Sequence, residues 1–177
     1  LIASRDKTFK GTVTPIFIIG MPRSGSTLIE QMLTSHSDFA SLGEDASISN
    51  QVVAYIEQKT QRPYPDCLAE LDQGLINTAR NIYIERLKQA PVVRPFMINK
   101  LPSNYQSLGL IYLLFPNAKF INMQRDYNAI AWSVFSNYFA ENEPYFCSLP
   151  EFKQYYDLYQ QLMAHWHNVM PEAIFDL

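Results

Sequence analysis

Four short apolar runs stand out along the chain and predict strands that are buried on both faces. The first covers residues 15–20, and the others lie at residues 96–99, 118–123 and 173–177. Each is rich in β-branched or aromatic residues and lies close to proline, glycine or polar residues that stop it, as is typical of strands in a parallel sheet.

Apolar residues recur at helical spacing between these runs and predict amphipathic helices. The expected helices lie near residues 28–36, 48–56, 71–87, 108–115, 130–138 and 152–166. Asp45 is a possible cap of the second, the third is expected to begin near Asp66, and residues 37–39 are expected to form a turn. Strands that alternate with helices predict a parallel sheet with helices on both faces, a three-layer α/β/α fold.

The stretch that joins the first strand to the first helix has the geometry of a phosphate-binding loop. Gly20 and Gly25 stand where the two glycines of a Walker A loop would, and Thr27 takes its hydroxyl position. Ser26 replaces the Walker lysine, while Arg23 supplies a planar guanidinium suited to oxyanions. The loop is therefore expected to bind a phosphate-like group but not the β- and γ-phosphates of ATP.

Other functions stay open for this loop. A nucleotide kinase or NTPase would use the same strand, loop and helix, but the missing lysine disfavours it. A non-catalytic nucleotide-binding fragment or an ordinary strand–turn–helix corner would also give this pattern. The coincidence of two glycines, an arginine and two hydroxyls favours anion binding.

Cations follow the predicted strands at their carboxyl ends. Lys100 ends the second strand and Arg125 follows the third. Ligands of open α/β sheets bind at this edge. Lys100, Arg125 and Arg23 are therefore expected to line one rim.

Composition narrows the function classes. The 177 residues carry a net charge of −3 without a dense lysine and arginine stripe, which argues against nucleic-acid binding. No apolar run approaches the roughly 20 residues that span a bilayer. Cys67 and Cys147 have no metal-type spacing; they could pair, but two free, part-buried thiols are the favoured expectation. The histidines form no plausible metal set: His36, His165 and His167.

These motifs resemble the sulfotransferases that use 3′-phosphoadenosine 5′-phosphosulfate (PAPS). Residues 22–28, PRSGSTL, and an arginine at 125 with Ser133 eight residues later carry the likeness. Residues 21–33, Gly43-Glu44 and Asn99-Lys100 make it closer to the tyrosylprotein sulfotransferases and to bacterial sulfotransferases with tetratricopeptide repeats.

The resemblance implies a role for each matching position. The 5′-phosphosulfate would be held by the loop, that is Arg23, Ser24, Gly25, Ser26 and Thr27. Arg125 and Ser133 would bind the 3′-phosphate. Glu44 would be the general base for the acceptor hydroxyl, while Lys100, with Arg23, would support charge on the transferring sulfuryl group. No metal is implied.

The resemblance also bears on domain and partners. Residues 1–13 are expected to be a lead-in or the remnant of an upstream region. Residues 14–177 would form the P-loop-like domain, incomplete at its C-terminus because the family domain usually continues. The acceptor would be a peptide tyrosine, a sugar or a small molecule. The compartment would be the cytoplasm for a bacterial protein and the Golgi lumen for a tyrosylprotein sulfotransferase.

Each assignment has a simpler structural alternative. Glu44 could cap or solvate its turn, Lys100 could be a surface charge, Arg125 could pair with Asp126, and Ser133 could be an ordinary helix serine. Trp132 and Tyr127 could stack on adenine, but packing in the core is the favoured expectation for both.

Overall fold

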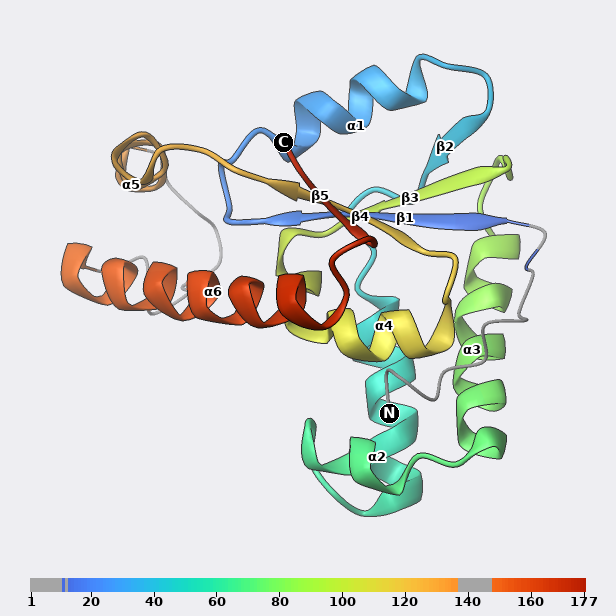
Figure 1. Ribbon diagram of the computed structural model, residues 1–177. Helices are drawn as coiled ribbons and strands as arrows, with labels where there is room; N and C mark the ends of the chain where they lie inside the picture. The colour runs from blue at the N-terminus through green and yellow to red at the C-terminus, as the bar shows by residue number, and fades with distance from the viewer. Residues whose placement is uncertain (1–10, 12, 137–147) are drawn as a thin grey trace.

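A computed structural model describes residues 11, 13–136 and 148–177. Its centre is a five-stranded, wholly parallel sheet with strand order β2-β3-β1-β4-β5 (Figure 1). The strands are β1 (Thr14–Gly20), β2 (Phe39–Ser41), β3 (Phe96–Lys100), β4 (Lys119–Met123) and β5 (Ile174–Asp176). The predicted parallel sheet is confirmed, and β1 lies at its middle.

Helices cover both faces of the sheet, as expected. They are α1 (Ser26–Thr34), α2 (Ala54–Thr60), α3 (Gln73–Lys88), α4 (Leu108–Leu114), α5 (Tyr127–Phe135) and α6 (Leu149–Val169). A π-helical segment η2 (Ile48–Val53) leads into α2, and two 3₁₀ segments precede α3 and α4: η3 (Asp66–Glu70) and η4 (Pro102–Ser107). In Figure 1, α1 lies on one face, with α3, α4 and α6 on the other. Among the described helices, none is both long and apolar enough to cross a bilayer.

The alternation of β1 side chains builds two cores. Phe17 and Ile19 belong to the large core beneath the sheet, where the Phe17 ring stacks on Tyr83 at 5.8 Å between centroids. Ile16 and Ile18 point the other way, into a smaller core covered by α1. Because successive strand residues face opposite sides, a fully apolar β1 is what a sheet covered on both faces requires.

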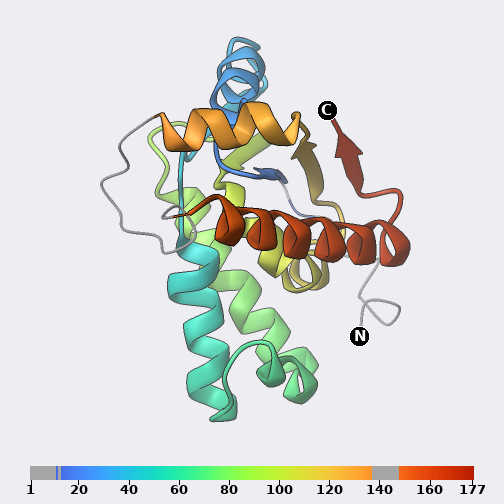
Figure 2. The ribbon, with the colours of Figure 1, turned by 90° about the vertical axis from the view of Figure 1, so that its left-hand side faces the viewer.

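Helix α5 is fixed beside α6 by aromatic contacts (Figure 2). Phe152 of α6 stacks on Tyr127 and meets Phe135 edge-on, each at 5.9 Å between centroids. Both are geometries that aromatic pairs favour. This packing sets the position of the α5 residues that follow the end of β4.

The structure corrects two expectations about element boundaries. Residues 39–41 form edge strand β2, paired in parallel with β3, where a turn was expected from residue 37. Helix α3 begins after Asp72, whose side chain caps it by accepting from the Leu75 amide at 2.7 Å, while Asp66 opens η3 instead. Tyr138 and Cys147 lie outside the described residues.

Other side chains are placed as follows. Tyr127 packs against the core, whereas Trp132 is 78% exposed, so the expected core packing of this tryptophan is wrong. Cys67 is a buried free thiol. His36 is exposed at the end of α1, and His167 lies 3.2 Å from the Asp176 carboxylate.

Candidate functional site

The loop after β1 has a backbone that few residues adopt. Gly20 has φ +141°, and a Cβ there would lie 2.8 Å from the carbonyl oxygen of Met123 at the end of β4. Arg23 has φ +65°, in the left-handed region that is costly for a residue with a side chain. Gly25 then caps α1, accepting from the Leu28 amide at 3.0 Å. The loop is thus held in a tight turn at the positive end of a helix dipole.

Hydroxyl groups follow the same turn. Ser24 is buried, and its Oγ has no hydrogen-bond partner among the groups that the structure describes. Ser26 is buried at the first residue of α1, and Thr27 is exposed beside it. An unpaired buried hydroxyl is costly, so Ser24 marks a place where a ligand oxygen would complete the hydrogen bonding.

The structure brings Arg23, Arg125 and Ser133 together. Arg23 Nε donates to the Ser133 Oγ at 3.0 Å, from the loop to helix α5. Arg125 Nη1 donates to the backbone carbonyl of Arg23 at 2.8 Å. Asp126, the alternative partner of Arg125, caps α5 by accepting from the Ala129 amide at 2.9 Å. The two guanidinium groups therefore lie at the carboxyl ends of neighbouring strands β1 and β4.

A cleft of about 290 Å³ opens beside this arginine pair. Arg125 contributes to its wall together with Met21 and Met123, and Tyr156, Tyr159 and Gln160 of α6 close the other side. Its volume is near the lower end of the range for small-molecule sites, which is roughly 300–1,000 Å³. Burial raises the pKa of Tyr159, so its hydroxyl stays protonated beyond the ordinary range of a tyrosine.

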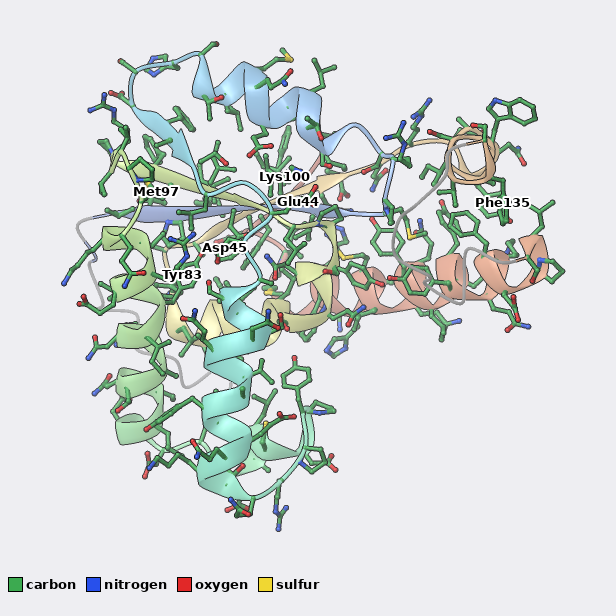
Figure 3. All side chains as sticks on the ribbon, turned by 180° about the vertical axis from the view of Figure 1, so that it is seen from behind. Glu44, Asp45, Tyr83, Met97, Lys100 and Phe135 are labelled. Atoms are coloured by element: carbon green, nitrogen blue, oxygen red, sulfur yellow. The ribbon has the colours of Figure 1, made fainter. Side chains whose placement is uncertain are left out.

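Lys100 and Glu44 meet on the other side of β1. Lys100 ends β3 and its side chain is only 7% exposed, so the alternative of a surface charge is wrong. Its Nζ contacts the Glu44 carboxylate, which is itself 65% exposed. Figure 3 shows the two residues close together near α1. A buried ammonium thus holds a carboxylate that remains open to solvent.

Backbone contacts fasten the Glu44 turn to β3. Gly43 has φ +66°, and its carbonyl accepts from the Lys100 amide at 2.9 Å. The side-chain amide of Asn99 donates to the Asp45 carbonyl at 3.0 Å. Glu44 is therefore held between two residues that are both bound to the strand carrying Lys100.

A buried polar network supports this turn from below. Asp45 is an ion-paired core residue: Arg86 Nε lies 2.6 Å from its Oδ2. Its Oδ1 accepts from the Ser47 amide at 3.1 Å, at the start of η2, which is a capping contact as expected. Asn99 also donates to the Tyr83 hydroxyl at 3.2 Å, and burial raises the pKa of Tyr83. Because Asp45 is occupied inside, Glu44 is the carboxylate of this turn that faces outward.

One residue of this site was not found from the sequence. Glu30 of α1 lies 3.9 Å from Lys100 Nζ through its Oε2, and its Oε1 accepts a hydrogen bond from Ser41. The spacing contains a signal for it: Glu30 follows Ser26 by four residues, so the two share one face of the helix that begins at the loop. No group of three or more His, Cys, Asp and Glu side chains that could hold a metal occurs in the described part of the chain.

Comparison with known proteins agrees with this geometry. Residues 15–177 match the sulfotransferase family. The chain belongs to that family. It is 33% identical over 171 residues to an uncharacterised protein of Aquifex aeolicus, covering 92% of this chain and 22% of that protein. It is 30% identical over 138 residues to rat protein-tyrosine sulfotransferase 1, covering 76% of this chain and 37% of the relative.

A solved family structure has the same fold. Sulfotransferase STF9 from Mycobacterium avium superposes with a TM-score of 0.53 at 14% identity, over 95% of this chain and 59% of that one. The chain thus spans less than two thirds of each of these relatives. Family membership and the α/β fold are established by these matches.

Proposed function

We propose that this domain transfers a sulfuryl group from PAPS to an acceptor hydroxyl. The observation that carries the proposal is the ion pair between Lys100 and the outward-facing Glu44. Lys100 ends β3, the strand next to β1, and β1 leads into the expected anion-binding loop. Family membership suggests an enzyme of this kind, and the pair supplies a base and a cation at one sheet edge.

The loop fits the phosphosulfate end of the donor. The unpaired Ser24 hydroxyl, the amides at the start of α1 and the exposed Thr27 provide donors for oxyanions. Arg125 and Ser133 would bind the 3′-phosphate at the end of β4, with the adjoining cleft available to the rest of the nucleotide.

The chemistry would follow an in-line displacement at sulfur. The acceptor oxygen forms a bond to sulfur while the bond between sulfur and the bridging phosphate oxygen breaks, and 3′,5′-diphosphoadenosine leaves. Glu44 would take the acceptor proton, and Lys100 with Arg23 would stabilise charge on the sulfuryl and bridging oxygens. The acceptor class is a hydroxyl compound, such as a peptide tyrosine, a sugar or a small molecule.

Nucleotide binding tests the proposal against the kinase alternative. Thermal unfolding is compared with 3′,5′-diphosphoadenosine, with 5′-AMP and with ATP plus Mg²⁺, because a ligand that binds the folded state raises the unfolding temperature. We expect the largest stabilisation from 3′,5′-diphosphoadenosine. Stabilisation by ATP and Mg²⁺ alone would refute the proposal.

A further inference from the structure

We propose that Glu30 is a positioning residue that holds the Lys100 ammonium in the site independently of Glu44. This inference rests on the proposed sulfuryl transfer, in which Lys100 must turn toward the donor. The two carboxylates around Lys100 differ in setting: the Glu30 side chain is 14% exposed, whereas that of Glu44 is largely open. Glu30 is thus the enclosed partner of a buried cation.

A single carboxylate could not serve both purposes. Glu44, as the base, becomes neutral when it takes the acceptor proton, and a buried ammonium that loses its charged protein partner is destabilised. Glu30 stays charged through that step and keeps Lys100 paired. Lys100 can then direct its hydrogen bonds to the sulfuryl or bridging oxygen without losing its place at the end of β3.

Ser41 ties this arrangement to the turn that carries Glu44. Its hydroxyl donates to Glu30 and accepts from the Gly43 amide at 2.9 Å. One hydroxyl thus connects helix α1, the end of β2 and the residue before Glu44. A carboxylate with one oxygen fixed by Ser41 and the other near Lys100 has little freedom to turn away.

The experiment is a double-mutant cycle with Glu30→Gln, Lys100→Met and both together. Glutamine keeps an acceptor for Ser41 but removes the charge. Glu30→Asp and Ser41→Ala provide milder variants should the glutamine variant fold poorly. Glu85→Gln is the matched control, because Glu85 also pairs with a lysine, Lys88, but on the solvent-exposed side of α3. Each variant is assayed for transfer, for binding of 3′,5′-diphosphoadenosine and for unfolding in urea.

We expect Glu30→Gln to lower kcat by about tenfold or more, as misplacement of a catalytic group does. Diphosphoadenosine affinity should stay within about twofold, because the loop is untouched. Glu30→Asp should recover part of the rate, and Glu30→Gln should add little to Lys100→Met. Rate losses that multiply in the double variant, or an unchanged kcat in Glu30→Gln, would overturn the inference.

The unfolding cycle separates this inference from the proposed function. In the unfolding equilibrium constant, we expect the effect of the double variant to differ by about fivefold or more from the product of the two single effects. Coupling of this size is typical of charged residues in contact. Additive effects would refute the Glu30–Lys100 pairing whatever the activity. If the parent protein binds no diphosphoadenosine and transfers nothing, the proposed function fails, and the cycle still decides the pairing.

Discussion

The Arg125 guanidinium donates a hydrogen bond to the backbone carbonyl oxygen of Arg23, with 2.8 Å between Nη1 and the oxygen. Arg23 is the non-glycine residue of the loop whose φ is positive, and its own side chain reaches Ser133 on α5. The side chain proposed to bind the 3′-phosphate therefore also supports the strained part of the loop proposed to bind the phosphosulfate. Binding at one end of the donor should favour the geometry at the other.

Arg125→Ala should remove the preference for a 3′-phosphate. We expect affinity for 3′,5′-diphosphoadenosine to fall by about tenfold to a hundredfold, the loss of one hydrogen bond to a charged group, with a much smaller effect on 5′-AMP. Calorimetric titration of both nucleotides measures the ratio. Arg62→Ala, which removes an exposed arginine paired with Glu70, is the control. Equal affinity for both nucleotides in the parent protein would contradict this prediction.

Glu44→Gln should separate binding from chemistry. The amide keeps the shape of the side chain but cannot accept the acceptor proton, so transfer should drop by about a hundredfold to ten-thousandfold. Diphosphoadenosine binding should persist, because Glu44 is not part of the loop. Transfer rates and equilibrium binding of the same preparation are compared, with Glu85→Gln alongside. Undiminished turnover would remove Glu44 as the base.

Gly20→Ala should destabilise the fold. The added Cβ would lie 2.8 Å from the Met123 carbonyl oxygen, closer than van der Waals contact allows, and φ is +141°. We expect a loss of about 1–3 kcal/mol in the free energy of unfolding, measured in urea. Gly74→Ala in α3 is the control, because its new Cβ would meet only the side-chain oxygen of Asp72, at 3.3 Å. Equal effects of the two substitutions would count against this explanation.

Alkaline pH should unfold the protein cooperatively. Burial raises the pKa values of Tyr83, Tyr105 and Tyr159 above the ordinary value of 10.0. Above that pH the unfolded chain releases these phenolic protons while the folded chain retains them, so stability is full below pH 10.0 and falls as the pH rises beyond it. Urea unfolding at several pH values measures the slope.

Tyr105→Phe provides the comparison for this pH dependence. The variant removes one buried phenol whose hydroxyl contacts that of Tyr155 at 2.7 Å. Its stability should fall less steeply with pH than that of the parent, since one fewer proton is retained on folding. Identical slopes would show that Tyr105 does not contribute.

Much of the fold was predictable because its signals are local. Strands β1, β3, β4 and β5 are short apolar runs near residues that break secondary structure, and such runs need no knowledge of their neighbours. Strand β2 was not predicted because its three residues are all only partly buried and show no alternation of apolar and polar positions. The start of α3 was misplaced because apolar residues continue through η3, and only the Asp72 cap marks the helix start.

The site was less predictable because its contacts join distant parts of the chain. Helical spacing gave α1 a row of apolar residues, yet Leu28 and Met32 are exposed. Glu30, a polar position on the same helix, is mostly enclosed because Lys100 and Ser41 offer it partners. The expected capping contact of Asp45 is present at the Ser47 amide, but its ion pair with Arg86 could not be predicted because Arg86 lies far along the sequence. Periodicity alone contains none of these pairings.

The strand order β3-β1-β4 gives the sheet edge a direction. On the β3 side, Lys100 lies between two carboxylates, Glu30 and Glu44, whereas Arg125 lies at the end of β4. A nucleotide bound in the reverse sense would place its 3′-phosphate beside a cluster of one cation and two carboxylates, which would attract it less than Arg125 does. The order of these three strands would therefore favour one orientation of the bound donor, whatever contacts the adenine ring or the acceptor makes.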